Sequence, residues 1–177
     1  TEFLKLAGSR PSIAKNYYLT GGTPLAAFYL RHRYSEDLDF FIEHEEVNLL
    51  AIKQLIKSAE QKFQLKNIAY KNYQGLHTFS LQYPKRRELK VDFNYYPFPR
   101  IESKTIMNCI KIDSLLDIAV NKVFTIYQKP RSRDFIDLYL IVKKTGWKMA
   151  DLIKKAKAKF DYHIDLLQLG TQFVRAE

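Results

Sequence analysis

The chain has 177 residues, of which 46% are hydrophobic and 14% aromatic; this is enough apolar material for one well-packed domain and excludes a disordered chain. Lysine and arginine outnumber aspartate and glutamate by 29 to 19, and the net charge of +10 favours polyanionic partners such as nucleic acid or nucleoside triphosphates. A single cysteine excludes an internal disulfide and a cysteine zinc cluster, and no apolar run approaches the roughly 20 residues of a membrane span, so we expect a cytoplasmic protein with no membrane contact.

The first part of the chain predicts an alternation of helices and strands. A short helix within Glu2–Lys15, broken at Pro11, comes first. It is followed by a buried strand at Asn16–Thr20, a helix from Thr23 to about Arg33, a strand at Asp37–Ile42, a helix at Val47–Phe63, and strands at Gln64–Tyr70, His77–Tyr83 and Leu89–Tyr95, the last two joined as a hairpin.

From residue 111 onward the apolar pattern is helical. Helices are expected at Ser114–Gln128, Arg133–Lys144, Met149–Phe160 and Ile164–Leu169. The lysines of the run KKAKAK, residues 154–159, are expected to form a solvated helix face. The whole pattern predicts an α/β (α+β) fold, with a core of mixed β-sheet flanked by helices in residues 1–107 and an α-helical C-terminal part in residues 108–177 that closes a cleft.

Two adjacent glycines, Gly21 and Gly22, separate the first strand from the next helix. Thr23 is a candidate N-cap and Pro24 suits the first helical position. Glycine lets the backbone approach a phosphate closely, and the unpaired N–H groups of a helix start favour an anion at the same place. The segment is therefore a candidate phosphate loop, although an ordinary tight turn has the same composition.

Two aspartates interrupt the next strand. In an extended chain Asp37 and Asp39 point to one face, while Leu38 and Phe40 point into the core. Their Cβ atoms would lie roughly 7 Å apart, so both carboxylates could reach one divalent ion or a pair. The alternative is an edge strand that uses charge to resist aggregation.

A third acid lies in the strand Leu89–Tyr95. Asp92 occupies the face opposite Val91 and Phe93, and this strand could neighbour the first acidic one. Three acids on adjacent strands can hold two magnesium or manganese ions, which neutralise a triphosphate and align the attacking and leaving oxygens. The alternative for Asp92 is a salt bridge with Lys90.

The helical part adds a lysine and two acids. Lys122 falls at the edge of the apolar face of its helix, where it can lean over a cleft and meet phosphate. Asp134 and Asp137 interrupt an apolar helix, and buried carboxylates need partners such as Lys122, Arg131 or Arg133. Lys122 could instead be a surface lysine, and the two acids could simply anchor helices through Arg131 or Arg133.

These segments together resemble a known family. GGT at residues 21–23, HRYSEDLDFF at residues 32–41, the later strand acid and RSRDFIDLY at residues 131–139 are similar to the AbiEii-type nucleotidyltransferase toxins, within the DNA polymerase β-like nucleotidyltransferases. The resemblance extends from about Phe3 to about Val142. It implies a nucleotidyltransferase-like core, magnesium-dependent transfer of a nucleotidyl group from an NTP to a hydroxyl, often on tRNA, and a cognate antitoxin protein.

The resemblance also implies roles for individual residues. In the family the lysine and the RDF aspartate belong to the active site, which corresponds here to Lys122 and Asp134. The positions carried over from the strand region are Gly21, Gly22 and Thr23 in the phosphate loop, Ser35 before the acids, Asp37 and Asp39 as metal ligands, and Asp92 as the third acid, which helps to activate the acceptor hydroxyl.

Two functions remain open from the sequence. The first is a nucleotidyltransferase that uses Mg²⁺ and an NTP and modifies RNA such as tRNA as the toxin of a toxin-antitoxin or abortive-infection system. The second is a catalytically inactive module of the same fold that binds nucleic acid or a protein partner. We predict the enzyme, because the glycine pair and the acids share one strand-helix-strand unit.

Overall fold

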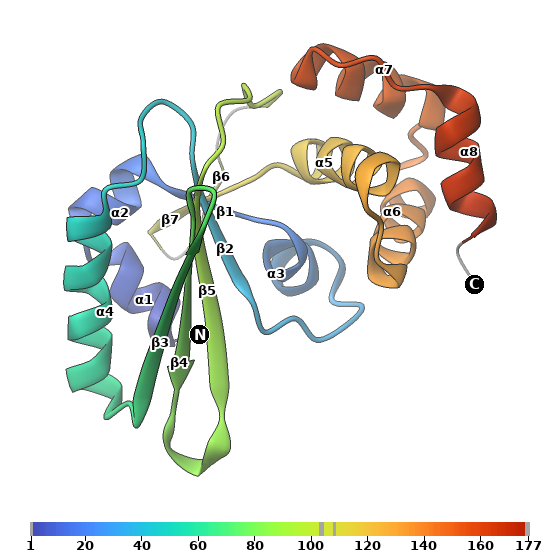
Figure 1. The fold of residues 1–177 in the computed structure, drawn as a ribbon. Helices are drawn as coiled ribbons and strands as arrows, with labels where there is room; N and C mark the ends of the chain where they lie inside the picture. Colours follow the sequence, from blue (N-terminus) through green and yellow to red (C-terminus); the bar gives the residue numbers. More distant parts are fainter. Residues whose placement is uncertain (1, 103–104, 108, 176–177) are drawn as a thin grey trace.

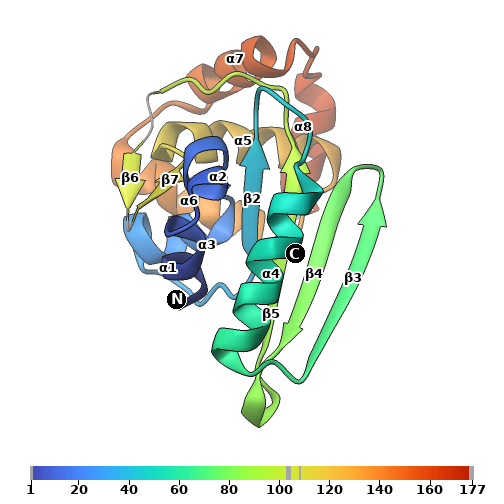
Figure 2. The same ribbon diagram turned by 90° about the vertical axis from the view of Figure 1, so that its left-hand side faces the viewer.

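The computed structural model describes residues 2–102, 105–107 and 109–175. A β-sheet has helices on one face and a group of helices beside the other face (Figure 1). The helices are α1 (Glu2–Gly8), α2 (Pro11–Asn16), α3 (Gly22–Pro24), η1 (Leu25–Leu30), α4 (Leu49–Phe63), η2 (Pro84–Arg86), α5 (Leu115–Gln128), α6 (Ser132–Thr145), α7 (Met149–Phe160) and α8 (Leu166–Val174). Figure 2 shows α1, α2 and α4 in front of the sheet and α5 to α8 behind it.

The sheet is mixed and has the order β3-β4-β5-β2-β1-β7-β6. Its strands are β1 (Tyr18–Thr20), β2 (Leu38–Ile42), β3 (Asn67–Tyr73), β4 (Leu76–Gln82), β5 (Glu88–Tyr95), β6 (Thr105–Met107) and β7 (Ile110–Ile112). The pairs β2–β5 and β1–β7 are parallel, and the other pairs are antiparallel. The predicted α/β class with a mixed sheet is confirmed, and so is the β4–β5 hairpin.

One hydrophobic core lies between the sheet and the helices α1, α2 and α4. Leu38, Phe40 and Ile42 of β2 are buried in it, as alternation predicts. Phe40 stacks on Phe93 of β5 with ring centroids 5.1 Å apart. The inward face of β2 and β5 is therefore fully used for packing, and their polar residues are left on the opposite face.

A second core is built from the helices α5 to α8 and Leu25 of η1. Lys159 of α7 points into this core, where its Nζ donates to Asp117 Oδ1 of α5 at 2.8 Å. The prediction that every lysine of KKAKAK faces solvent was therefore wrong for Lys159. A buried ammonium group is stable here because a buried carboxylate pairs with it.

The helix after the glycine pair differs from its prediction. Gly21, not Thr23, precedes its first turn, and it continues through α3 as a π-helix, η1, to Leu30. Arg31 adopts a left-handed conformation with φ +54° and ends it, so His32 and Arg33 stand outside the helix. Because the helix ends at Arg31, the side chains of His32 and Arg33 can contact the helical half.

Other boundaries also shifted. Gln64 takes a left-handed conformation at the end of α4, which delays the next strand to Asn67. The strands β6 and β7 were not predicted, and α8 extends to Val174. The predicted division after residue 107 falls beside residue 108, which lies outside the described residues, and this division stays a prediction.

Within the part of the chain that the structure describes, no helix is long and apolar enough to cross a membrane.

Candidate active site

Three acidic side chains meet on the sheet face that turns away from α4. Asp39 of β2 and Asp92 of β5 are direct partners in adjacent parallel strands, so both side chains lie on one face. Asp37 stands one residue before β2, and its charge acts on Asp39 together with that of Asp92. The structure thus places Asp39 and Asp92 side by side, with Asp37 near enough for its charge to act on Asp39.

The carboxyl group of Asp39 is disfavoured in its ionised form. Burial, followed by the charge of Asp92, raises the pKa of the Asp39 carboxyl from 3.8 to about 6. Lys90 Nζ donates to Asp92 Oδ2 at 2.6 Å, so the ion pair considered as the alternative for Asp92 does exist. Asp92 Oδ1 is buried and has no hydrogen-bond partner among the described residues. One oxygen of Asp92 is therefore held by lysine and the other is left for a ligand.

A divalent cation suits this cluster chemically. Neighbouring carboxylates are stabilised by a shared cation, and oxygen is the ligand that Mg²⁺ prefers. Among residues 2–102, 105–107 and 109–175, however, no group of three or more His, Cys, Asp or Glu side chains is arranged to hold a metal ion. Asp37 is partly exposed and lies 4.0 Å from the Arg133 guanidinium, and Lys90 holds Asp92. The three-carboxylate metal site stays a prediction.

The glycine pair lies directly against these acids. Gly21 has φ +79°, a region that favours glycine, and a Cβ at this position would stand only 2.7 Å from Asp39 Oδ2. A Cβ at Gly22 would overlap the Arg33 guanidinium and approach Ser35 Oγ to 3.2 Å. Both positions therefore favour glycine for steric reasons, and Gly21 favours it for its backbone conformation as well.

Thr23 and Ser35 fix the loop that carries the acids. The buried Thr23 hydroxyl donates to the carbonyl oxygen of Asp37 and lies 3.0 Å from Ser35 Oγ. These contacts replace the N-cap role predicted for Thr23. The two hydroxyls thus connect the glycine segment to the start of β2.

Lys122 of α5 is buried at the centre of an ionic network. Its Nζ lies 2.5 Å from Asp134 Oδ1 and 2.8 Å from Asp137 Oδ2, both on α6. The alternative of a surface lysine is therefore wrong. Asp134 also accepts a hydrogen bond from the backbone N–H of Arg131.

Asp137 joins this network to the strand half. It accepts hydrogen bonds from Arg33 Nε at 2.8 Å and Arg33 Nη2 at 2.9 Å, and His32 Nε2 lies 2.7 Å away. Burial alone would raise the pKa of Asp137, but the Arg33 hydrogen bonds and the charge of Lys122 bring this pKa well below its ordinary value. Asp137 therefore stays ionised and holds cationic groups from both halves, rather than serving only as a helix anchor.

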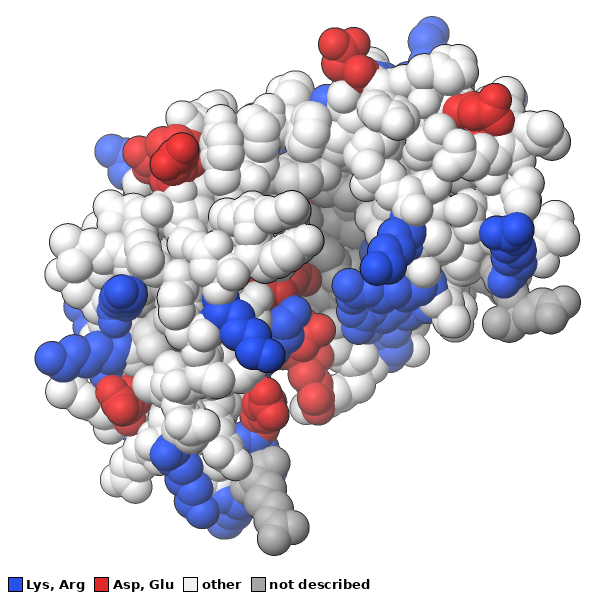
Figure 3. Space-filling view, in the orientation of Figure 1, with Lys and Arg blue, Asp and Glu red and all other residues white. Residues whose placement is uncertain are grey.

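A cavity of about 480 Å³ lies between the sheet and the helical half, and Gly21, Asp39 and Lys122 line it together. Six aromatic side chains form much of its remaining wall: Phe41, Tyr96, Phe98, Phe124, Phe160 and Tyr162. Figure 3 shows acidic side chains in the hollow between the halves, with lysine and arginine side chains on both sides. The glycine loop, the acid Asp39 and the lysine Lys122 come from distant parts of the sequence and line the same cavity.

Sequence reasoning missed several of these residues. The aromatic wall comes from four separate segments, and helix or strand periodicity marks such residues only as core. Arg33 and His32 stand in the motif HRYSEDLDFF, but no local pattern indicates a partner more than 100 positions away at Asp137. Their position immediately before the acids was the available signal.

The mixed sheet, the acids on adjacent strands and the glycine segment define a nucleotidyltransferase fold. The structure is similar to JHP933 from Helicobacter pylori, with a TM-score of 0.62 and 21% identity over 98% of this chain and 87% of that chain. It is also similar to MenT4, a nucleotidyltransferase toxin from Mycobacterium tuberculosis H37Rv, with a TM-score of 0.54 and 13% identity over 88% of this chain and 60% of that one.

The family model described as "Nucleotidyl transferase AbiEii toxin, Type IV TA system" matches residues 4–175, and the chain belongs to this family. It is also 31% identical over 151 residues to the protein aq_aa25 of Aquifex aeolicus (strain VF5), which corresponds to 84% of this chain and 68% of that protein. The predicted family is confirmed. The protein is accordingly a nucleotidyltransferase, which favours the enzyme over the inactive binding module.

Proposed function

We propose that the protein transfers a nucleotidyl group from an NTP to a hydroxyl of an RNA acceptor such as tRNA, with the help of divalent metal ions. The observation that carries the proposal is the pairing of Asp39 with Asp92 in register, beside a cavity that Gly21 and Lys122 also line. Acids, glycine loop and lysine are the groups that nucleotidyl transfer requires, and here they converge.

Asp37, Asp39 and Asp92 are the residues that would hold two Mg²⁺ or Mn²⁺ ions. Such ions, when bound, neutralise the triphosphate and polarise its α-phosphate. The raised pKa of Asp39 and the unpartnered Asp92 Oδ1 support this assignment, because burial and the neighbouring charge of Asp92 disfavour the ionised Asp39 carboxyl and a cation would stabilise it.

The cavity suits the nucleoside triphosphate. Its volume of about 480 Å³ lies within the range of small-molecule sites, and its aromatic wall offers surfaces on which a base can stack. Lys122 lines the same space, where its Nζ is paired with Asp134 and Asp137, and we propose that this group also contacts the phosphates. Gly21 and Gly22 let the backbone approach the triphosphate without a side chain in between.

The reaction forms one bond and breaks another. The acceptor oxygen attacks the α-phosphorus, the bond from this phosphorus to the bridging oxygen breaks, and pyrophosphate leaves. The proton of the hydroxyl passes to a carboxylate, for which Asp92 Oδ1 is free of other partners among the described residues. Lys90 keeps the other oxygen of Asp92 fixed, so the free oxygen has a defined direction.

The test is incubation with magnesium, each labelled NTP in turn and total tRNA. The expected result is label in RNA for the wild type and a loss of at least about 100-fold for Asp39→Asn, because the carboxylate is replaced by a neutral isostere. The matched control is Asp151→Asn, an exposed aspartate of α7, which should retain full transfer. Absence of transfer from all four NTPs, or an active Asp39→Asn variant, would overturn the proposal.

A cognate antitoxin is the further partner that we propose, because the family consists of toxins of toxin-antitoxin systems. Expression of the wild type should arrest bacterial growth, and expression of Asp39→Asn should not. Co-expression of the antitoxin should restore growth. Equal growth with both forms would remove the support for a toxic role.

A further inference from the structure

The acids belong to a longer polar face of the sheet. Strand register places Lys71, Thr78, Asp92 and Asp39 in one row across β3, β4, β5 and β2. Direct partners in adjacent strands share a face, so the row runs from the acid cluster to the free edge at β3. Three strand spacings separate Asp39 from Lys71, or about 14 Å.

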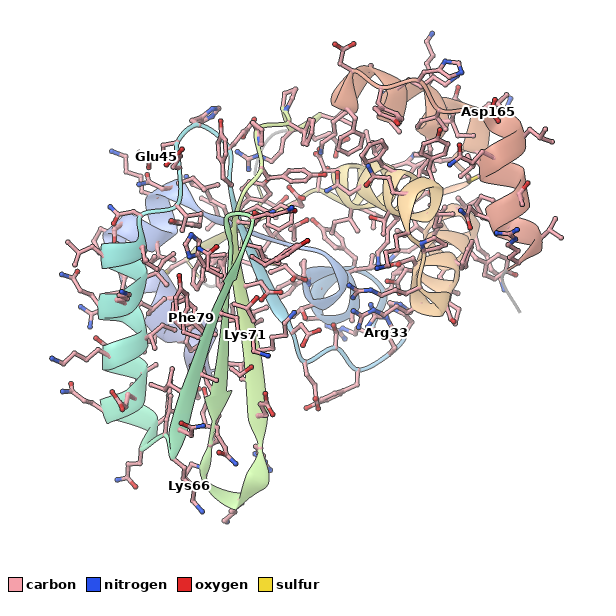
Figure 4. All side chains as sticks on the ribbon, viewed as in Figure 1. Arg33, Glu45, Lys66, Lys71, Phe79 and Asp165 are labelled. Atoms are coloured by element: carbon pink, nitrogen blue, oxygen red, sulfur yellow. The ribbon has the colours of Figure 1, made fainter. Side chains whose placement is uncertain are left out.

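This face is the one that α4 does not cover. The opposite face carries Phe79, Leu81 and Val91, which are buried in the core with α4. Figure 4 shows Phe79 on the side of α4 and Lys71 on the other side of the strands. In Figure 1 no helix lies over the outer side of β3 and β4.

The open face carries positive charge and an exposed ring. Lys71 is exposed, and Lys90 lies in the neighbouring row beside Ser80. Tyr73, two residues after Lys71 on the same face, is 72% exposed. Glu88 is an acidic residue of this face that does not belong to the acid cluster. It lies at the other end of β5 from the cluster and pairs with Gln82. The row that leads from the acids to the edge of the sheet therefore ends in the positive charge of Lys71.

We propose that this open face of β3, β4 and β5 holds the RNA acceptor, with Lys71 at its phosphates and Tyr73 stacked on a base. Cationic strands with an exposed aromatic ring are a recurrent platform for single-stranded nucleic acid. The proposal rests on nucleotidyl transfer as the proposed function, and it names the surface that presents the acceptor.

The arrangement of the two substrates supports this surface. The cavity lies on the side of β1, β2, α5 and α7, where Gly21, Asp39 and Lys122 line it. From Asp39 the polar row leads in the other direction, through Asp92 with its unpartnered oxygen. An NTP in the cavity and an acceptor on the open face would thus meet at the acids from opposite sides, as in-line attack requires.

The experiment measures transfer to a short single-stranded RNA with a free terminal hydroxyl, and binding of the same RNA by fluorescence anisotropy at several salt concentrations. Lys71→Glu and Tyr73→Ala should each raise KM for the RNA about tenfold and leave KM for the NTP unchanged. Lys71→Glu should also lower the salt dependence of binding by about one phosphate contact. Ala69→Lys, on the same face, should tighten binding.

Matched controls lie across the sheet on α4. Lys57→Glu and Gln54→Lys change the charge equally at exposed positions of that helix and should not alter RNA binding or transfer. If Lys71→Glu and Ala69→Lys behave like these controls, the surface is not the acceptor site, whereas transfer by the wild type would still support the proposed function. Label found in protein instead of RNA would also overturn the proposal. If the wild type transfers no label, the proposed function fails, and the RNA-binding measurements still test whether this face binds RNA.

Discussion

Gly21 shows how one absent side chain shapes the site. Its φ of +79° lies where side chains are strained, and a Cβ would collide with Asp39. We predict that Gly21→Ala abolishes nucleotidyl transfer, since Asp39 must move, and costs about 1–3 kcal/mol of stability from the backbone strain. Activity assays and urea unfolding measure the two effects.

The matched control for Gly21→Ala is Gly146→Ala. Gly146 also has a positive φ, +73°, but a Cβ there would meet open space. This variant should lose some stability and keep its activity. An active Gly21→Ala enzyme would show that the close approach to Asp39 is not needed for catalysis.

The sequence predicts which face of the sheet each acidic side chain within a strand occupies. It predicts only some of the residues that contact these side chains. Alternation alone places Asp39 opposite Leu38 and Phe40, and the structure agrees, whereas Asp37 stands one residue before the strand. The pairing of Asp137 with Arg33 and Lys122 depends instead on tertiary packing between the strand half and the helical half. No local physical rule links positions that far apart.

At the scale of elements, one buried ion pair fastens α7 to α5. Lys159 and Asp117 have side chains that are 1% and 0% exposed, and Asp117 also accepts hydrogen bonds from the backbone of Ile101 and Glu102. We predict that Lys159→Ala destabilises the protein by about 3–5 kcal/mol, because it leaves a buried carboxylate without its cation. Thermal or urea unfolding checks this value.

Lys155→Ala is the control at the same helix. Lys155 is exposed, so its removal should change the free energy of unfolding by less than about 0.5 kcal/mol. Equal effects of the two substitutions would mean that the pair with Asp117 contributes nothing to the attachment of α7.

Long amphipathic elements were predictable, and short or irregular ones were not. The pattern of α4 marks Ile52, Leu55 and Ala59 on one side, and these residues are buried. The strands β6 and β7 have three residues each, too few for a period to emerge. The end of α4 at Gln64 had no glycine to signal the left-handed conformation that it adopts.

At the scale of the whole molecule, Asp113 connects the two cores. It follows β7, its N–H donates to Leu19 of β1, and its carboxylate accepts from Thr20 at 2.5 Å and from Asn121 of α5 at 3.4 Å. Tyr29 of η1 donates to its carbonyl oxygen. Burial raises the pKa of the Asp113 carboxyl from 3.8 to about 7, although the Thr20 hydrogen bond opposes this shift.

This raised pKa makes stability depend on pH. Between pH 4 and pH 7 the carboxyl of Asp113 is protonated in the folded protein and ionised in the unfolded chain. The contribution of this proton to the free energy of unfolding is therefore fully present below about pH 4 and is lost as the pH rises through about 7. We predict that the wild type loses about 4 kcal/mol relative to Asp113→Asn over this interval. Unfolding by urea at several pH values measures the difference, with Asp151→Asn as an exposed control. A difference that is constant with pH would contradict the prediction.

The long separation between Arg33 and Asp137 also has a consequence for protein synthesis. A ribosome releases the glycine segment and the first acids early, but the carboxylate that holds Arg33 and Lys122 is made about 100 residues later. Until that helix has emerged, Lys122 of the cavity wall lacks both carboxylates that hold its Nζ. The ionic network that joins the two halves is therefore completed only after most of the chain has been made.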